Sequence, residues 1–192
     1  MNNFFVFEGP DEVGKTTVIS ALEKRLIETG KNCISFSFPG RENSTLGGHI
    51  YELHHNLSLF KINEITPLSL QILHVAAHAD IVERKILSLL EEQKTVILLD
   101  RYWWSTWVYG VTSGIPKKQL KALIDLEKTF WNNIYPTQLF LFSRPASDSP
   151  SNLTQAYNEL ALLEHENHPI INLINNGTVD DAVNSILTHM KL

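Results

Sequence analysis

Cysteine is almost absent from this sequence of 192 residues, which contains only Cys33. A single cysteine excludes an internal disulfide, and its position in an apolar run predicts a buried structural thiol rather than a reactive one. No apolar stretch is long enough to span a membrane, and the N-terminal segment lacks the basic residues of a signal peptide. These absences favour a protein of the reducing cytoplasm.

Basic residues are also in the minority, with 16 lysines and arginines against 21 aspartates and glutamates. The net charge of −5 argues against a broad nucleic-acid-binding surface, although it leaves room for a local basic pocket around a phosphate. No internal repeat, low-complexity tract or Gly/Ser linker divides the chain. We therefore expect one globular domain over residues 1–192, with neither nucleic acid nor a membrane as a partner.

Strand and helix patterns alternate along the whole chain. Apolar runs predict five strands, at residues 3–8, 32–38, 95–100, 138–143 and 170–174. Helical patterns lie at residues 15–28, 45–57, 67–91, 103–111, 117–131, 152–166 and 178–190. This order is typical of βαβ units, so we expect a three-layer α/β fold with a five-stranded parallel sheet flanked by helices. In such folds ligands bind at the carboxyl ends of the strands.

The first strand leads into a glycine-bounded loop and then into a helix. Residues 9–17 fit the pattern G-x-x-x-x-G-K-[ST] of a phosphate-binding P-loop. Its glycines permit a close backbone approach to phosphate, Lys15 reaches the β- and γ-phosphates, and the Thr16 hydroxyl is placed to ligate Mg²⁺. A chance match is the alternative, but the flanking strand and helix favour ATP and Mg²⁺ as cofactors. The expected ATP-binding residues are Gly9, Glu12, Val13, Gly14, Lys15, Thr16 and Thr17.

Two further strands end in arginines. The segment Phe38-Pro39-Gly40-Arg41 follows the second strand, and Asp100-Arg101-Tyr102 follows the third. Either arginine alone would be interpreted as part of a surface salt bridge. Two guanidinium groups at strand ends facing a P-loop, however, predict a second anion site. Asp100 ends a Walker-B-like strand, where it would either hold Mg²⁺ or orient Arg101.

Three blocks make the sequence resemble the thymidylate kinase family of P-loop nucleoside monophosphate kinases: residues 7–17, 38–41 and 100–109. The resemblance implies a P-loop NTPase fold and transfer of the ATP γ-phosphoryl to dTMP, giving dTDP. It also implies that Asp11 approaches the 3′-hydroxyl of the acceptor and that Tyr109 packs under its sugar. Homodimers through long helices are common in the family, which makes helix 66–91 a candidate interface. The acceptor-binding residues that it implies are Asp11, Phe38, Arg41, His74, His78, Arg101, Ser105, Thr106 and Tyr109.

The resemblance has gaps around the transferring phosphoryl group. The family usually places an arginine there, either in the P-loop, where this chain has Glu12, or in a lid after the fourth strand. Here the lid, at about residues 144–151, is short and contains one arginine, Arg144. We expect Lys15, Asp11, Arg101 and Arg144 to be the catalytic residues. Arg144 could instead anchor the loop through a salt bridge. The missing arginine could then be replaced by Lys117 or Lys118 or supplied by a partner, or the activity could be weak.

The base-recognition helix differs as well. The family has a phenylalanine that stacks on thymine and an arginine four residues later, and this chain has His74 and His78. Gly110 replaces a residue that is commonly polar. Our hypothesis is that His78 reads the edge of the base, and the alternatives to thymine are another pyrimidine or a bulkier modified base. The same two histidines have metal-ligand spacing, but no third ligand follows nearby.

Three functions remain open on the sequence alone. The first is a thymidylate kinase-like enzyme, and the second is a kinase of the same fold for another (deoxy)nucleotide or a small phosphorylated metabolite. The third is a nucleotide-binding module with weakened catalysis, which Glu12 and the short lid favour. The lack of an Asn-Lys-x-Asp motif argues against a GTPase switch.

Overall fold

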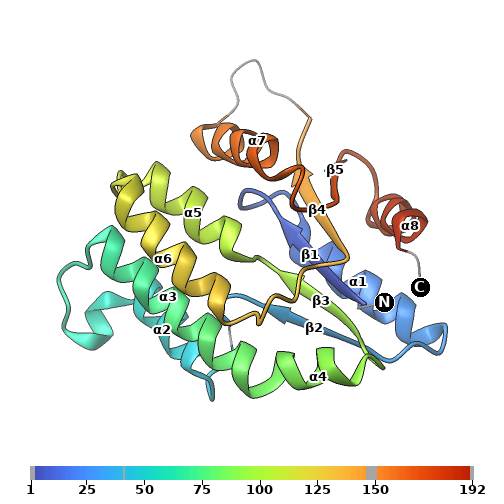
Figure 1. Cartoon of the computed structure of the whole chain (residues 1–192), viewed down its shortest axis with the longest axis horizontal. Helices are drawn as coiled ribbons and strands as arrows, with labels where there is room; N and C mark the ends of the chain where they lie inside the picture. The colour runs from blue at the N-terminus through green and yellow to red at the C-terminus, as the bar shows by residue number, and fades with distance from the viewer. Residues whose placement is uncertain (1–2, 41, 146–150, 191–192) are drawn as a thin grey trace.

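Five parallel strands form the centre of the described structure, in the order β2-β3-β1-β4-β5 (Figure 1). The computed structural model describes residues 3–40, 42–145 and 151–190. The arrangement confirms the predicted α/β fold with a parallel sheet. The strands are β1 (Phe4–Glu8), β2 (Cys33–Ser37), β3 (Val96–Asp100), β4 (Gln138–Ser143) and β5 (Ile170–Ile174).

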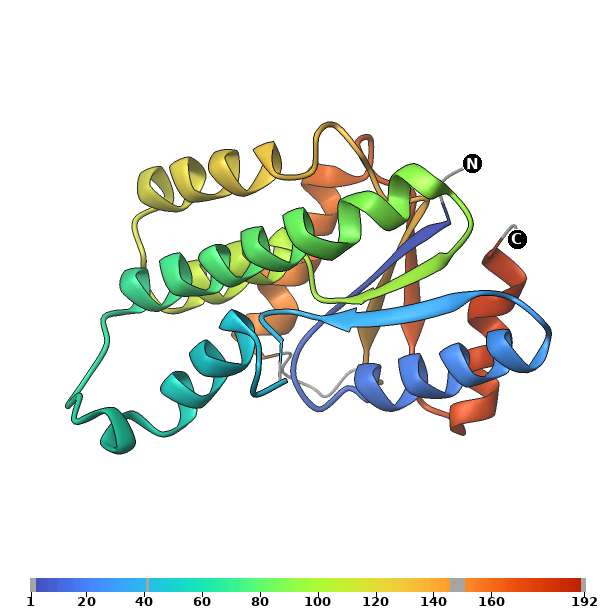
Figure 2. The same ribbon diagram turned by 90° about the horizontal axis from the view of Figure 1, so that it is seen from below.

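Helices cover both faces of the sheet, as Figure 2 shows from below. One face carries α1 (Lys15–Glu28) and α8 (Val179–His189). A further helix, α2 (Leu46–His55), packs against α3. The opposite face carries α3 (Pro67–Ile81), α4 (Leu87–Glu92), α5 (Trp103–Thr112), α6 (Lys117–Thr129) and α7 (Asn152–Glu164).

Strand β1 joins the two hydrophobic cores. Phe4 and Val6 pack into the core on the side of α5 and α6, whereas Phe5 and Phe7 pack into the core under α1 and α8. Successive side chains of a strand point to opposite faces, and a central parallel strand is covered on both. A continuous apolar run is therefore what this position requires.

The helix predicted over residues 67–91 is interrupted. It begins as expected, with Pro67 in the first turn and the Thr66 side chain accepting a hydrogen bond from the Ser69 N–H. At Val82–Ile86 the helix widens into a π-helical turn before α4 begins. Side-chain periodicity does not reveal such a change of backbone hydrogen bonding. The helix predicted at 45–57 likewise ends at His55, and a 3₁₀ turn follows.

The predicted burial of Cys33 is confirmed. Thr178 and Asp181 form a capping box at the start of α8. Trp103 and Trp104 lie in the core. Within the described ranges every helix is too short or too polar to cross a membrane.

The strand register sets the position of the loops. Phe7 is paired with Asp100, Ser37 is also paired with Asp100, and Glu8 is paired with Leu141. The loops after β1, β2 and β3 therefore leave the sheet at one edge. This is the edge at which open parallel sheets bind their ligands.

Candidate active site

The glycine loop between β1 and α1 is held by close contacts that require glycine. Gly9 has a φ of +137°, and a Cβ built there would lie 2.3 Å from the Phe142 carbonyl oxygen. Gly14 has a φ of +90°, and its Cβ would lie 2.6 Å from the Asn175 side chain. Larger residues would therefore strain the backbone and collide with β4 or with the loop after β5. The Asn175 amide in turn donates to the Val13 carbonyl oxygen at 2.8 Å.

Lys15 bends back over this loop. Its Nζ donates to the carbonyl oxygens of Gly9 at 2.8 Å and Pro10 at 2.6 Å. Burial, followed by the nearby positive charge of Arg101, lowers the pKa of Lys15 to about 8. A phosphate anion beside the ammonium group would stabilise its charged form, as the predicted role of Lys15 requires.

Thr16 and Asp100 form a polar pair at the floor of the loop. The Thr16 hydroxyl donates to Asp100 Oδ2 at 2.8 Å, although the two residues are 84 positions apart. The second carboxylate oxygen, Oδ1, is buried and has no hydrogen-bond partner in the described structure. A free carboxylate oxygen next to a hydroxyl fits Mg²⁺, which prefers oxygen ligands and keeps several waters. The predicted metal-binding residues are therefore in contact.

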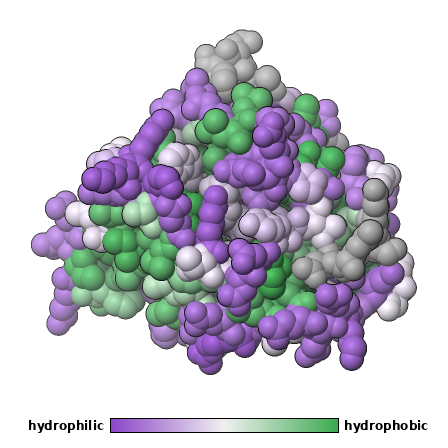
Figure 3. Space-filling view, viewed as in Figure 1, coloured by the Kyte–Doolittle hydropathy of each residue, from purple (hydrophilic) through white to green (hydrophobic). Residues whose placement is uncertain are grey.

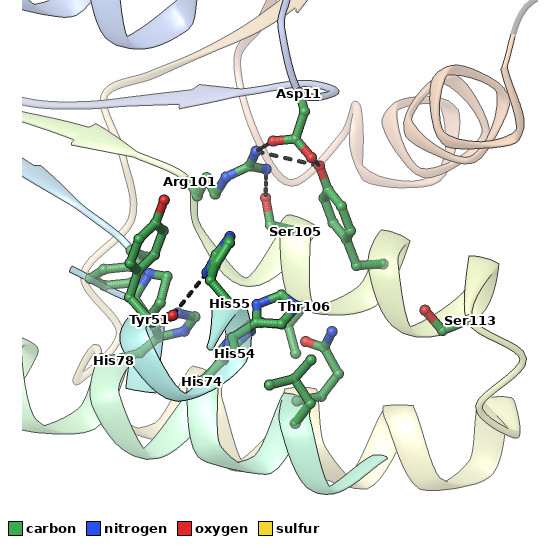
Figure 4. Close-up of a pocket in the computed structure, with 15 residues that line it drawn as sticks. Asp11, Tyr51, His54, His55, His74, His78, Arg101, Ser105, Thr106 and Ser113 are labelled. Atoms are coloured by element: carbon green, nitrogen blue, oxygen red, sulfur yellow. Dashed lines mark hydrogen bonds and ion pairs between the residues drawn. The ribbon is translucent and has the colours of Figure 1, made fainter. Parts of the chain in front are cut away.

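Arg101 is the centre of a second polar cluster, shown in Figure 4. Its guanidinium group donates to Ser105 Oγ at 3.0 Å and to Tyr109 Oη at 3.3 Å, and it forms an ion pair with Asp11. Tyr109 also donates to Asp11. Arg101 has a φ of 75°, a left-handed conformation that is rare for a residue with a side chain and that is found at functional sites. Four of the residues predicted to bind the phosphoryl acceptor are therefore in contact with one another.

Glu8, for which no role was predicted from the sequence, forms hydrogen bonds with residues next to Arg101. Its Oε1 accepts hydrogen bonds from the N–H groups of Tyr102 at 2.7 Å and Ser105 at 3.1 Å. Its Oε2 accepts from the hydroxyls of Ser105 at 2.7 Å and Tyr157 at 3.1 Å. Burial raises the pKa of Glu8, and the neighbouring Arg101 charge opposes that rise. The sequence did contain one sign of this role, because Glu8 is a carboxylate at the end of a wholly buried strand.

Two cavities adjoin at Arg101. One, of about 320 Å³, lies over the glycine loop and reaches Lys15 and Thr16. The other, of about 360 Å³, extends from Asp11 toward α2 and α3. Asp11, Phe38 and Arg101 line both. The second cavity, here called the acceptor cavity, has as its other lining residues Pro39, Tyr51, His54, His55, Leu70, Gln71, His74, His78, Ser105, Thr106, Tyr109 and Ser113.

Histidines of α2 and α3 gather along one side of the acceptor cavity (Figure 4). His78 stacks on Phe38, with ring centroids 4.0 Å apart, and His74 lies 5.4 Å from His54. The predicted base-contacting residues His74 and His78 therefore do line a cavity. His54 and His55, on α2, were not predicted to take part. Among the described residues, no group of three or more histidine, cysteine, aspartate or glutamate side chains is arranged to hold a metal ion.

The sequence model of one family, described as Thymidylate kinase, matches residues 7–149, which is more than half of the chain. The chain belongs to the thymidylate kinase family. A thymidylate kinase of Chlamydia trachomatis serovar L2 is 38% identical over 149 residues, which are 76% of this chain and 68% of the relative. A thymidylate kinase of Prosthecochloris aestuarii is 29% identical over 182 residues, which are 91% of this chain and 78% of the relative.

Coverage of other relatives is lower. A thymidylate kinase of Thermoanaerobacter sp. (strain X514) is 36% identical over 124 residues, so this chain spans only 58% of the length of that relative. The crystal structure of thymidylate kinase from Ehrlichia chaffeensis superposes with a TM-score of 0.78 at 21% identity and covers 98% of both chains. That likeness shows the shared fold.

The structure describes two of the residues that depart from the thymidylate kinase pattern, Arg144 and Glu12. Arg144 forms no salt bridge among the described residues; it donates to the carbonyl oxygens of Asn175 at 3.2 Å and Glu12 at 3.5 Å. It therefore touches the glycine loop, and no carboxylate of the described residues faces it. Glu12 itself is exposed, with a φ of 62°. Arg41 and positions 146–150 of the expected lid lie outside the described residues.

Other predicted residues have clear positions. Lys117 and Lys118 are exposed at the start of α6 and do not line either cavity. Thr17 is exposed and lines the cavity over the glycine loop. Thr106 lines the acceptor cavity, but its hydroxyl donates to Glu127 at 3.0 Å. Tyr157 packs in the core, and its hydroxyl also bonds with Ser105 at 2.8 Å.

Proposed function

We propose that this protein transfers the γ-phosphoryl group of ATP to dTMP, giving dTDP. The observation that carries the proposal is the junction of the two cavities at Asp11, Phe38 and Arg101. A triphosphate over the glycine loop and a monophosphate in the acceptor cavity would meet there. Membership of the thymidylate kinase family supports dTMP as the acceptor.

Phosphoryl transfer depends mainly on position and on compensation of charge. The ATP phosphates would take the Lys15 ammonium group from the carbonyl oxygens of Gly9 and Pro10. Thr16 and Asp100 would hold Mg²⁺, which supplies neutralisation of phosphate charge when bound. An oxygen of the acceptor phosphate attacks the γ-phosphorus, the bond to the β-phosphate oxygen breaks, and ADP leaves.

Arg101 would bind the acceptor phosphate, and we propose the same role for Arg41. The guanidinium of Arg101 is held in place by Ser105 and Tyr109, so its position does not depend on the ligand. Asp11 accepts from both Arg101 and Tyr109, and we propose that it also receives the 3′-hydroxyl of the acceptor. Tyr109 would pack against the deoxyribose and disfavour a 2′-hydroxyl.

Release of ADP over a panel of monophosphates tests the proposal. With dTMP, dUMP, dCMP, dAMP and dGMP as acceptors, we expect the highest turnover with dTMP. Lys15→Ala and Arg101→Ala should each reduce turnover by about 10²–10³-fold, because each removes a charged donor from the reacting phosphates. Lys24→Ala is the matched control, since Lys24 lies on the exposed side of α1 in a pair with Glu28 at 3.9 Å. If another monophosphate is turned over faster than dTMP, dTMP is not the preferred acceptor and this part of the proposal is wrong.

A nucleotide-binding module with weakened catalysis is the second candidate. It is favoured by Glu12 in the glycine loop and by the backbone contacts of Arg144, which leave the transferring phosphoryl group without a described arginine partner from the lid. Binding of ATP without turnover of any acceptor would support this function. Arg144→Ala separates the two, because loss of turnover with unchanged ATP affinity would assign Arg144 to catalysis.

Pairing of two copies through the helix at 66–91 stays a prediction. Figure 3 shows apolar side chains among the polar ones at the end of the molecule where α2 and α3 lie. Leu59, Phe60 and Ile72 are exposed apolar residues of this region, which supports such pairing. Analytical ultracentrifugation would measure the state of association.

A further inference from the structure

A buried tyrosine of α7 reaches the cluster around Arg101 without lining either cavity. Tyr157 is 1% exposed, and it is not among the residues that line the acceptor cavity or the cavity over the glycine loop. Its hydroxyl oxygen lies 2.8 Å from Ser105 Oγ, 3.1 Å from Glu8 Oε2 and 3.5 Å from Arg101 Nη1. Tyr157 therefore contacts residues of the proposed site but does not face a ligand there.

The distances within this group indicate how its hydroxyl protons are used. Each hydroxyl has one proton to donate, and a carboxylate oxygen only accepts. Ser105 Oγ is the closer of the two hydroxyls to Glu8 Oε2, at 2.7 Å, so it donates there. The Tyr157 proton is then shared between Ser105 Oγ and the same Glu8 oxygen, and Arg101 Nη1 donates to Ser105 Oγ at 3.0 Å. Ser105 Oγ thus gives one hydrogen bond and receives two, which uses its full capacity.

The guanidinium group of Arg101 is held on two sides. Nη1 bonds with Ser105 and lies beside the Tyr157 oxygen. Nη2 donates to Tyr109 at 3.3 Å and pairs with Asp11. Tyr109 and Asp11 both line the acceptor cavity, so a ligand can reach the Nη2 side. The Nη1 side is anchored by a tyrosine that lies in the core.

A buried tyrosine hydroxyl needs a hydrogen-bond partner wherever it lies, and this need by itself would be a purely structural reason for these contacts. Tyr157 also packs among apolar residues of the core, and α7 lies against α5 (Figure 1). All three polar neighbours of its hydroxyl, however, belong to the group that holds Arg101. A structural role and a role in positioning Arg101 make different predictions for kinetics.

We propose that Tyr157 is a positioning residue that fixes the guanidinium group of Arg101 for phosphoryl transfer and acts through Ser105. Because Tyr157 takes one lone pair of Ser105 Oγ, one lone pair remains for Arg101 Nη1, and the guanidinium group has a single place. Phosphoryl transfer depends on donors that are in place before the reaction. The inference rests on the proposed function and adds a residue of α7 that touches neither substrate.

Tyr157→Phe removes the hydroxyl and keeps the ring. The freed lone pair of Ser105 Oγ then allows the guanidinium group of Arg101 to tilt. The net effect of one hydrogen bond corresponds to a factor of about 2 to 12, so we expect kcat with dTMP to fall about fivefold. KM for dTMP should change less than about twofold, because the charge of Arg101 still attracts the phosphate.

A double-mutant cycle tests whether Tyr157 acts through Ser105. Ser105→Ala removes the oxygen on which Tyr157 and Arg101 meet. Adding Tyr157→Phe to Ser105→Ala should therefore lower kcat by less than about 1.5-fold. If the two residues acted independently, their separate losses would multiply in the double variant. That outcome would overturn the proposed path.

Rotation of the Arg101 guanidinium group, measured by ¹⁵N NMR without nucleotide, gives a second readout. The Nη signals are assigned by their loss in Arg101→Lys. We expect slow rotation and separate Nη lines in the wild type, and faster rotation with broadened lines in Tyr157→Phe. Leu160→Val is the matched control, because Leu160 is buried in the same core on α7 and lines neither cavity. It should leave both the Nη lines and kcat unchanged.

Several results would overturn the inference. These are free rotation of Arg101 in the wild type, and a kcat or a set of Nη lines in Tyr157→Phe equal to those of Leu160→Val. In the wild type alone, the Tyr157 hydroxyl proton should show a nuclear Overhauser effect to the Nη1 protons of Arg101. Its absence overturns the inference even if Tyr157→Phe does not fold.

Failure of the proposed function is seen separately. If the wild type turns over no monophosphate, the kinase assignment fails, and the NMR comparison without nucleotide still decides whether Tyr157 holds Arg101. Slow rotation that is lost in Tyr157→Phe and kept in Leu160→Val supports the positioning role. Rotation that is the same in all three proteins overturns it.

Discussion

Replacing Glu8 by alanine should destabilise the protein strongly, although Glu8 contacts neither proposed substrate. The carboxylate accepts four hydrogen bonds, two of them from the N–H groups of Tyr102 and Ser105 at the start of α5. The Ser105 and Tyr157 hydroxyls are 2.8 Å apart and can bond with each other after the change. The two N–H groups would lose their buried partner, whereas Arg101 would keep its ion pair with Asp11.

The cost follows from those groups. An unsatisfied buried N–H costs about 1–3 kcal/mol, so the two N–H groups together cost about 2–6 kcal/mol. We therefore expect Glu8→Ala to lower the free energy of unfolding by about 4 kcal/mol and the Tm by roughly 8–16 °C for a chain of this length. Glu8→Gln keeps one carbonyl oxygen for both N–H groups, so its cost should be about half as large.

Urea unfolding followed by tryptophan fluorescence measures both variants, because Trp104 and Trp131 are fully buried. Glu28→Ala is the control: Glu28 is exposed and pairs with Lys24 at 3.9 Å, so its loss should cost less than about 1 kcal/mol. A Glu8→Ala variant within 1 kcal/mol of the wild type would refute the role given to this carboxylate. Equal losses for Ala and Gln would assign the effect to the charge facing Arg101 rather than to the N–H groups.

Three further results are expected. The pKa of Lys15 is about 8 in the protein without ATP, and a bound phosphate would raise it. ATP affinity measured by calorimetry should therefore be about tenfold weaker at pH 9 than at pH 7. An affinity that does not change with pH would contradict this. Gly47→Ala would place a Cβ 1.7 Å from the Pro39 carbonyl oxygen, so KM for the acceptor should rise severalfold; an unchanged KM would show that the loop after β2 does not shape the acceptor cavity. Burial raises the pKa of the Cys33 thiol to about 12, so Ellman's reagent should label the native protein only as fast as it unfolds, and rapid labelling would be inconsistent with that burial.

Much of the fold could be predicted because it is encoded locally. The continuous apolar run Phe4–Phe7 satisfies two covered faces of a sheet, and the glycine spacing after it is required by backbone angles within a few residues. The order of strands and helices left few topologies, since parallel strands need long crossovers. The predicted contact between Thr16 and Asp100 follows from the rule for strand ends.

The residues that sequence reasoning missed act through long-range contacts. Glu8 meets Tyr157 across 149 positions, and Glu127 meets His78 across 49. In sequence, Glu127 resembles any helical glutamate, because the pattern of α6 says nothing about which helix will cover that face. The π-helical turn at Val82–Ile86 could not be predicted for another reason, since it changes the backbone hydrogen bonds but not the spacing of the apolar residues.

The strands, the glycine loop and the edge of the sheet where ligands bind could be predicted from the sequence, because each depends on periodicity or on backbone angles between near neighbours. The side chains that orient Arg101 and His78 could be identified only in the folded chain. Those contacts depend on how three helices pack over the sheet, and a carboxylate becomes a partner only where burial leaves it no water to bind.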